Sequence, residues 1–288
     1  MWLWLTVLSA LLLGTYDVAK KRALKRNGVY WILVTATGLT ALYLSPFLFL
    51  KTGSLSDHLS LVLKAVLVSL SWVSGLKAME CLPLTTVSTI KASRPMFVLI
   101  FSIILFGEKL NLLQWLGVAV VMTALFLSSR SKHHETDKKT SAKGISLMIL
   151  SVLAGSASAL YDKHILQQLN LDPMFVQSWT NVYITVLLAL LLLIKWLREK
   201  EAFEGFRWDW TIVLIGVLIT ISDACYFFAL KDGDALLSVV SMIRRGAVVI
   251  TFIAGALLFK EHNIRDKAVD LAVLLAGLAL LLFGSSLG

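Results

Sequence analysis

Long apolar runs, separated by short polar segments, dominate the chain. Ten runs of about 20 residues follow one another, at 2–19, 29–50, 59–79, 84–106, 112–129, 144–164, 174–196, 208–230, 235–259 and 268–284. A helix of this length crosses the hydrocarbon core of a bilayer. The pattern therefore predicts an all-α polytopic membrane protein with ten transmembrane helices and no separate soluble domain.

The composition agrees with this class of protein. Of 288 residues, 58% are hydrophobic and only 16% are charged, and the mean hydropathy is +0.81. A soluble globular protein is less apolar. The first run has no basic leader, so we expect a span there rather than a removable signal peptide. Cys81 and Cys225 give no indication of a disulfide.

Basic residues gather in alternate loops between the predicted spans. Eighteen Lys and Arg residues fall in the loops after spans one, three, five, seven and nine. Five fall on the other side: Lys51, Lys64, Lys109, Lys163 and Lys231. The positive-inside rule places the first group in the cytoplasm, so both termini would lie outside. The net charge of +9 thus reflects membrane topology and not a nucleic-acid partner.

Short motifs recur in order along the chain. Tyr16-Asp17 returns as Tyr161-Asp162, the segment 88–91 returns at 241–244, and 105–108 returns at 258–261. These matches divide the chain into two five-span repeats, 1–129 and 143–288, joined by a polar linker at 130–142. Because five is odd, the second repeat must be inverted in the membrane. Inverted repeats are common in transporters, whose binding sites lie near the midplane.

Four cations lie deep within predicted spans. Lys91 and Arg94 belong to the fourth span, and Arg244 and Arg245 to the ninth. Each costs about 2.5–3.5 kcal/mol in hydrocarbon. Helical spacing puts Ser88 on the face of the first two, and Ser241 one turn before the second two. We therefore expect these residues to face a polar cavity.

The predicted acids do not balance these cations. Asp223 is the one acid that the pattern places deep in a span, whereas Asp17 and Asp162 lie nearer span ends. The surplus of positive charge suits an anionic substrate held by an arginine fork. The alternative is an internal network of Asp223, backbone carbonyls and water. The three acids are also candidates for coupling a proton.

Other features have a structural and a functional interpretation. Pro95 should kink the fourth span, as a hinge or as a tolerated bend. Tyr226 and Trp179 are candidate cavity walls, although core packing is the commoner role. The small residues at 154–159 predict close helix packing. Glu108 and Glu261 follow spans and are expected to begin the next helices, where the dipole favours a carboxylate.

Enzyme chemistry finds no support in the sequence. The histidines fall in loops or at span ends, so no metal centre forms within the membrane. Glycine-rich nucleotide loops and nucleophile elbows are absent from the sequence. We predict a protein that is not an enzyme and needs no cofactor.

Residues 77–127 resemble the second half of an EamA-type repeat of the drug/metabolite transporter superfamily. The similarity rests on Pro95, on Gly107-Glu108 at the turn, and on Gln-Trp-Leu-Gly at 114–117. The second copy matches less fully, with Val248 and Lys260-Glu261 at the corresponding positions. The resemblance implies two inverted five-helix repeats and a carrier that works by alternating access. Members move amino acids, drugs, sugars and nucleotide precursors.

Residues 241–252, SMIRRGAVVITF, are similar to a Lys-Arg stretch in plastid triose-phosphate translocators and some nucleotide-sugar transporters. That resemblance implies that Arg244 and Arg245 contact a phosphate. We therefore expect a secondary active transporter of a small anionic metabolite in a bacterial inner membrane, with a proton or a counter-substrate as coupling partner. Bacterial EamA-type carriers usually have both termini inside, opposite to the charge bias. An amino-acid or drug exporter and a lipid-headgroup flippase remain alternatives.

Overall fold

The computed structural model describes residues 1–23, 27, 29–49, 53–82, 90–91, 93–130, 142–198, 207–247, 249–250 and 264–286. The regular structure in these ranges is helical throughout, without a strand. The α-helices are α1 (Trp2–Ala23), α2 (Val29–Tyr43), α3 (Leu55–Cys81), α5 (Arg94–Phe106), α6 (Leu112–Arg130), α7 (Ala142–Lys163), α8 (Pro173–Arg198), α9 (Trp210–Lys231), α10 (Leu237–Arg244) and α12 (Ile264–Ser286).

Five helices are long and apolar enough to cross a membrane. They include the stretches Trp2–Lys20, Leu55–Gly75, Ala142–Gln168, Pro173–Leu197 and Trp210–Lys231. These stretches fall in the first, third, sixth, seventh and eighth predicted spans. The structure thus supports an all-α membrane protein. The ninth predicted span is described only in part, because residues 251–263 lie outside the described ranges.

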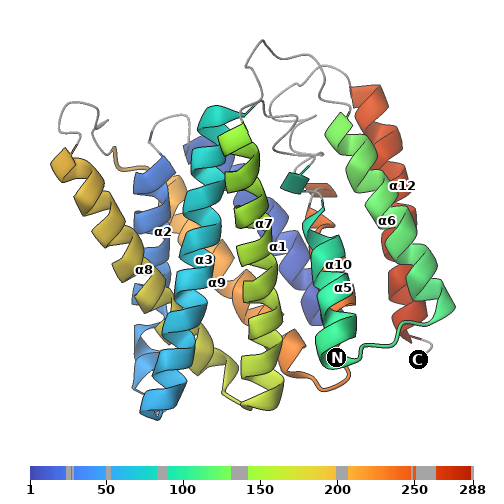
Figure 1. Cartoon of the computed structure of the whole chain (residues 1–288), viewed down its shortest axis with the longest axis horizontal. Coiled ribbons are helices and arrows are strands. Elements are labelled where there is room, and N and C mark those ends of the chain that lie inside the picture. The colour runs from blue at the N-terminus through green and yellow to red at the C-terminus, as the bar shows by residue number, and fades with distance from the viewer. Residues whose placement is uncertain are drawn as a thin grey trace.

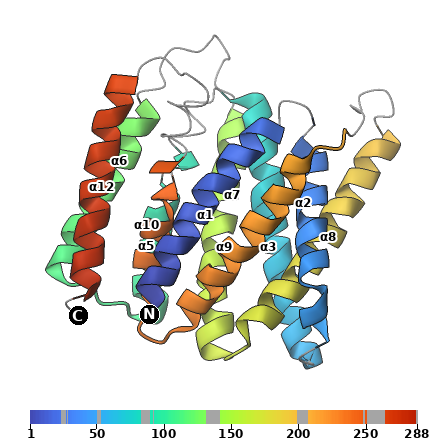
Figure 2. The same cartoon turned by 180° about the vertical axis from the view of Figure 1, so that it is seen from behind.

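The helices form a row of crossing pairs. α1 packs on α9, α3 on α7, α2 on α8, and α6 on α12. Figures 1 and 2 show α6 and α12 at one end of the row and α2 and α8 at the other. Residue 1 and the end of α12 lie on one face, here called the terminal face. α1 begins there, whereas α7 begins on the opposite face, here called the linker face.

Small side chains bring the crossing helices close together. Ser9 and Ser222 each donate a hydrogen bond to the other's carbonyl, at 2.8 and 2.9 Å. Ser71 and Ser151 do the same at 2.7 and 2.6 Å. A side-chain carbon added at Gly155 would lie 2.8 Å from the Ser71 hydroxyl oxygen. The predicted close packing at 154–159 is therefore confirmed.

The largest buried cluster lies at the centre of the row. It includes Leu61, Val98, Tyr226, Phe227 and Ile243, which come from α3, α5, α9 and α10. Burial of this apolar surface stabilises the helices around the charged residues described next.

Candidate functional site

Two helix breaks position the cations that the sequence singles out. Ile90 and Lys91 are helical, Ser93 forms a turn, and α5 begins at Arg94. α10 ends at Arg244, and Arg245 lies in the turn that follows. The expected kink at Pro95 is therefore corrected to a break just before it. Pro95 lies in the first turn of α5, where a missing N–H breaks no helical hydrogen bond.

Lys91, Arg94, Arg244 and Arg245 converge, and we call them the cationic cluster. Lys91 interacts electrostatically with Arg94 and Arg245, and Arg245 interacts with Arg94 and Arg244. Asp17 lies within range of Lys91 and Arg245. Charged residues far apart in the chain thus lie within electrostatic range of one another near the helix breaks. Ser241 precedes Arg244 by one turn of α10, whereas Ser88 lies outside the described residues.

Lys20 was not predicted as a site residue, because the apolar pattern places it in the loop after the first span. Its ammonium interacts electrostatically with Lys91 and lies 5.5 Å from the Tyr16 ring centroid. The last turns of α1 therefore extend the positive charge of the cluster. The signal in the sequence is Tyr16 and Lys20 at a spacing of four, which puts them on one helix face.

Arg244 is the best-connected member of the cluster. Its Nη2 donates to Asp223 at 2.9 Å, and its guanidinium lies 4.2 Å from the centroid of the Tyr226 ring. The side chains of this pair are 19% and 30% exposed, so the space beside them is open. Its buried Nε has no hydrogen-bond partner among the described residues. The guanidinium therefore retains a donor beyond the bond to Asp223.

A second acid, Asp162, is buried beside Tyr226. Asp162 accepts a hydrogen bond from Tyr226 at 3.2 Å and forms an ion pair with Lys64. Both Asp162 and Lys64 are buried, and Lys64 also lies 4.1 Å from the Phe227 ring centroid. α7 ends at Lys163, and a π-helical turn, η2 (His164–Gln168), follows it directly. Asp162 lies near the end of its span as expected, but Lys64 lies within α3 and not in a loop.

Arg94 is held by the backbone of α7. Its Nη2 donates to the Gly155 carbonyl at 2.5 Å, and the Ser156 hydroxyl donates to the Arg94 carbonyl at 3.5 Å. A side-chain carbon at Gly155 would lie 2.7 Å from the Arg94 Cζ. The arginine therefore fits only because residue 155 has no side chain.

Glu108 has a different position from the one expected. α6 is capped by Asn111 and Gln114, because the backbone N–H of each donates to the side-chain amide oxygen of the other at 2.9 Å. Glu108 instead accepts from the Leu237 N–H at 2.6 Å, at the start of α10. Gly107 ends α5 with φ +64°, a left-handed conformation that favours glycine and turns the chain toward α10. The expectation that Glu108 begins the next helix was wrong, and Glu261 lies outside the described residues.

The Glu108 carboxylate also pairs with Lys163. Their charged atoms are 2.7 Å apart, and the side chains are 1% and 7% exposed. Sequence reasoning missed this pair because it placed Lys163 among the loop lysines. The charge of Lys163 next to Asp162 is the signal that could have revealed it.

Trp179 lies in an aromatic group with His58 and Tyr183. Its ring centroid is 4.6 Å from that of His58 and 5.8 Å from that of Tyr183. His58 Nδ1 and the Tyr183 hydroxyl are 2.9 Å apart. The structure thus brings Tyr226 to the arginines but places Trp179 among other aromatic side chains.

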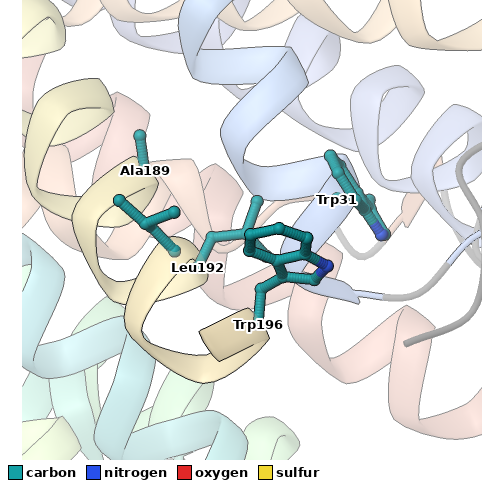
Figure 3. Close-up of a pocket in the computed structure, with 5 residues that line it drawn as sticks. Trp31, Ala189, Leu192 and Trp196 are labelled. Carbon is teal, nitrogen blue, oxygen red and sulfur yellow. The ribbon is translucent and has the colours of Figure 1, made fainter. Parts of the chain in front are cut away.

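A cavity of about 270 Å³ lies between α2 and α8 (Figure 3). Its lining is apolar: Trp31, Ala189, Leu192, Leu193 and Trp196. It shares no residue with the cationic cluster, and it lacks the charged groups that an anion needs.

The comparisons with known proteins agree with the helical architecture and decide the family. A sequence profile described as the EamA-like transporter family matches residues 1–130 and 142–283. The chain belongs to the EamA-like transporter family. It is therefore an integral membrane transporter and not an enzyme.

One similar solved structure bears only the description "Crystal structure of protein". It is 13% identical, has a TM-score of 0.78, and the match covers 98% of this chain and 97% of that one. At this identity the likeness concerns the fold alone. No curated protein matches the chain.

Proposed function

We propose that this EamA transporter is a secondary active carrier of a small anionic metabolite, with phosphorylated compounds among the candidates. The observation that carries the proposal is the convergence of Lys91, Arg94, Arg244 and Arg245. Asp223, Asp17 and Asp162 supply the nearby negative charge, and Asp162 is already paired with Lys64, so the cationic cluster remains in excess. An anion restores the balance while it is bound.

The helix breaks add to this positive potential. α5 begins at Arg94, and a helix N-terminus carries roughly half a positive charge. Arg94 and Lys91 lie at this same end. Oxyanions such as phosphate and carboxylate bind well where N–H groups and an arginine fork meet.

The packing supports two inverted five-helix repeats with ten spans. Exchanging the first repeat for the second turns the α1–α9 pair into the α7–α3 pair, and both pairs are observed. The α2–α8 and α6–α12 pairs map onto themselves. α1 and α7 also begin on opposite faces, as inversion requires (Figures 1 and 2). In such folds the substrate site opens alternately to either side.

The remaining expectations concern the partners and the membrane. Asp17, Asp162 and Asp223 are candidates for coupling a proton to anion movement, and a counter-substrate is the other choice. The alternate loops rich in Lys and Arg favour a cytoplasmic linker face, in a bacterial inner membrane.

The site proposal is tested by uptake of candidate phosphate and carboxylate anions into proteoliposomes, with Arg244→Ala and Arg245→Ala. A thermal-shift screen against anionic metabolites first identifies a ligand. Loss of a charged hydrogen bond costs about 1.5–3 kcal/mol, so we expect affinity to fall about 10–100-fold. Arg207→Ala removes an exposed arginine outside the site and serves as the matched control. The site is wrong if both cluster variants keep the affinity of the unmodified carrier.

One observation favours the amino-acid alternative. Asp223 and Arg244 form an ion pair of which both members are partly exposed, so both can meet a ligand. A zwitterion presents an ammonium and a carboxylate that could exchange with this pair. Saturable uptake of neutral aromatic amino acids, without uptake of phosphorylated anions, would favour that substrate class.

A further inference from the structure

Glu108 joins three elements at the terminal face. Its carboxylate lies just after α5, pairs with Lys163 at the end of α7, and accepts from the start of α10. The second carboxylate oxygen accepts from the Ser238 N–H at 3.1 Å and from the Ser238 hydroxyl. Lys163 also donates to the Ala235 carbonyl at 3.3 Å. Every bond that Glu108 makes here connects segments distant in the chain.

The burial of this group contrasts with that of the cluster. Glu108 and Lys163 are 1% and 7% exposed, whereas Asp223 and Arg244 are 30% and 19% exposed. Lys91 and Asp17, toward the linker face, are exposed. The structure is thus closed at Glu108 and more open toward the linker face.

α10 connects the two regions. Its eight residues extend about 12 Å at 1.5 Å per residue. Glu108 binds its first N–H groups, and Arg244 is its last residue. The residue before the helix, Leu236, provides no side-chain cap of its own. The position of Arg244 therefore depends on a carboxylate from another part of the chain.

We propose that Glu108 and Lys163 form a latch that holds the terminal face closed and positions α10 for substrate binding. Glu108 acts as a positioning residue, because it reaches the substrate site only through α10. Opening toward the terminal face requires the Glu108 carboxylate to leave the start of α10. This inference rests on the proposed alternating access but not on the identity of the anion.

The test is cysteine labelling of purified carrier in detergent, where the reagent reaches both faces. Cys81→Ser and Cys225→Ser remove the native thiols. Ala235→Cys then places a reporter at a fully buried position beside the latch, and Val121→Cys places one at a fully buried position between α6 and α12. Reaction with a water-soluble maleimide is measured without any substrate.

Lys163→Met should raise labelling at position 235 about tenfold, because labelling follows the population of the open state. Labelling at position 121 should stay slow. Lys163→Arg keeps the charge and should restore slow labelling at 235. Glu108→Gln provides a second variant of nearly the same shape, with the same expected result. Asp57→Asn alters an exposed acid at the start of α3 and should change neither reporter.

Two results would overturn the latch. Unchanged labelling at 235 in both Lys163→Met and Glu108→Gln would show that the face stays closed without the pair. Equal acceleration at 121 and 235 would show general loosening of the fold and no local opening. The proposed function fails separately, through the uptake assay on Arg244 and Arg245, since no anion is present during labelling.

Discussion

At the scale of single residues, the pair of Lys64 and Asp162 illustrates how buried charges depend on one another. Both side chains are nearly inaccessible, and the Tyr226 hydroxyl is a further partner of the carboxylate. A buried ion pair stabilises little relative to apolar residues of similar shape, but removal of one member leaves an uncompensated charge. The two single substitutions are therefore much more costly than the joint one.

We expect Lys64→Met to lower the free energy of unfolding by about 3–5 kcal/mol. Lys64→Met combined with Asp162→Asn should recover part of that loss, because no lone charge remains. Denaturant titration of the purified carrier in detergent measures the free energy of unfolding of the single and the double variant. Equal losses in the single and double variants would contradict the coupling.

Some residues of the buried charged groups can be recognised from the sequence, and others cannot. Arg94 and Arg244 stand out, since a charge in the middle of an apolar run costs free energy wherever the run folds. Lys163 and Glu108 lie at the ends of runs, where a charge has no cost in water. Their burial arises only when α10 packs over them, and no local pattern specifies that contact.

At the scale of elements, the contact between α5 and α7 depends on one missing side chain. A side-chain carbon at Gly155 would lie 2.7 Å from Arg94 and 2.8 Å from Ser71. Arginine is flexible, but its guanidinium is bonded to the Gly155 carbonyl and cannot move without losing that bond. The substitution should therefore separate the two helices or displace the arginine.

Gly155→Ala should lower the free energy of unfolding by about 1–3 kcal/mol, as overpacking does. Gly233→Ala makes the same change where no atom lies within 4 Å, and should have little effect. Thermal unfolding of the two variants compares them directly. Similar melting temperatures for both would contradict the tight fit between α5 and α7.

Helix identity was more predictable than helix continuity. The apolar runs located α1, α3, α7, α8 and α9, because a run of about 20 apolar residues is long enough to cross a bilayer. The break before Arg94 was expected only as a kink. Proline fixes its own φ and removes one N–H, but how far the preceding residues unwind depends on the neighbours that bind them.

At the scale of the whole molecule, the charge bias and the fold describe the same two faces. α6 ends and α7 begins at the linker face, opposite the start of α1 and the end of α12 (Figure 1). Because Lys64 and Lys163 are buried in ion pairs, they no longer count as loop residues of the terminal side.

The reciprocal serine hydrogen bonds join helices of different repeats and not helices of the same repeat. Ser9–Ser222 ties α1 to α9, and Ser71–Ser151 ties α3 to α7. Each tie joins a helix from residues 1–130 to one from residues 142–283. A disulfide formed by Ser9→Cys with Ser222→Cys should therefore leave uptake largely intact. Loss of uptake that a reducing agent restores would contradict this.

We therefore expect that the moving parts of the carrier each take helices from both repeats, because α1 packs on α9 and α3 on α7. For the same reason, we expect that the two halves of the chain do not fold independently. Separately expressed fragments 1–130 and 142–288 would each lack the partner helices that cover their polar serines. They should become a carrier only when made together in the same membrane.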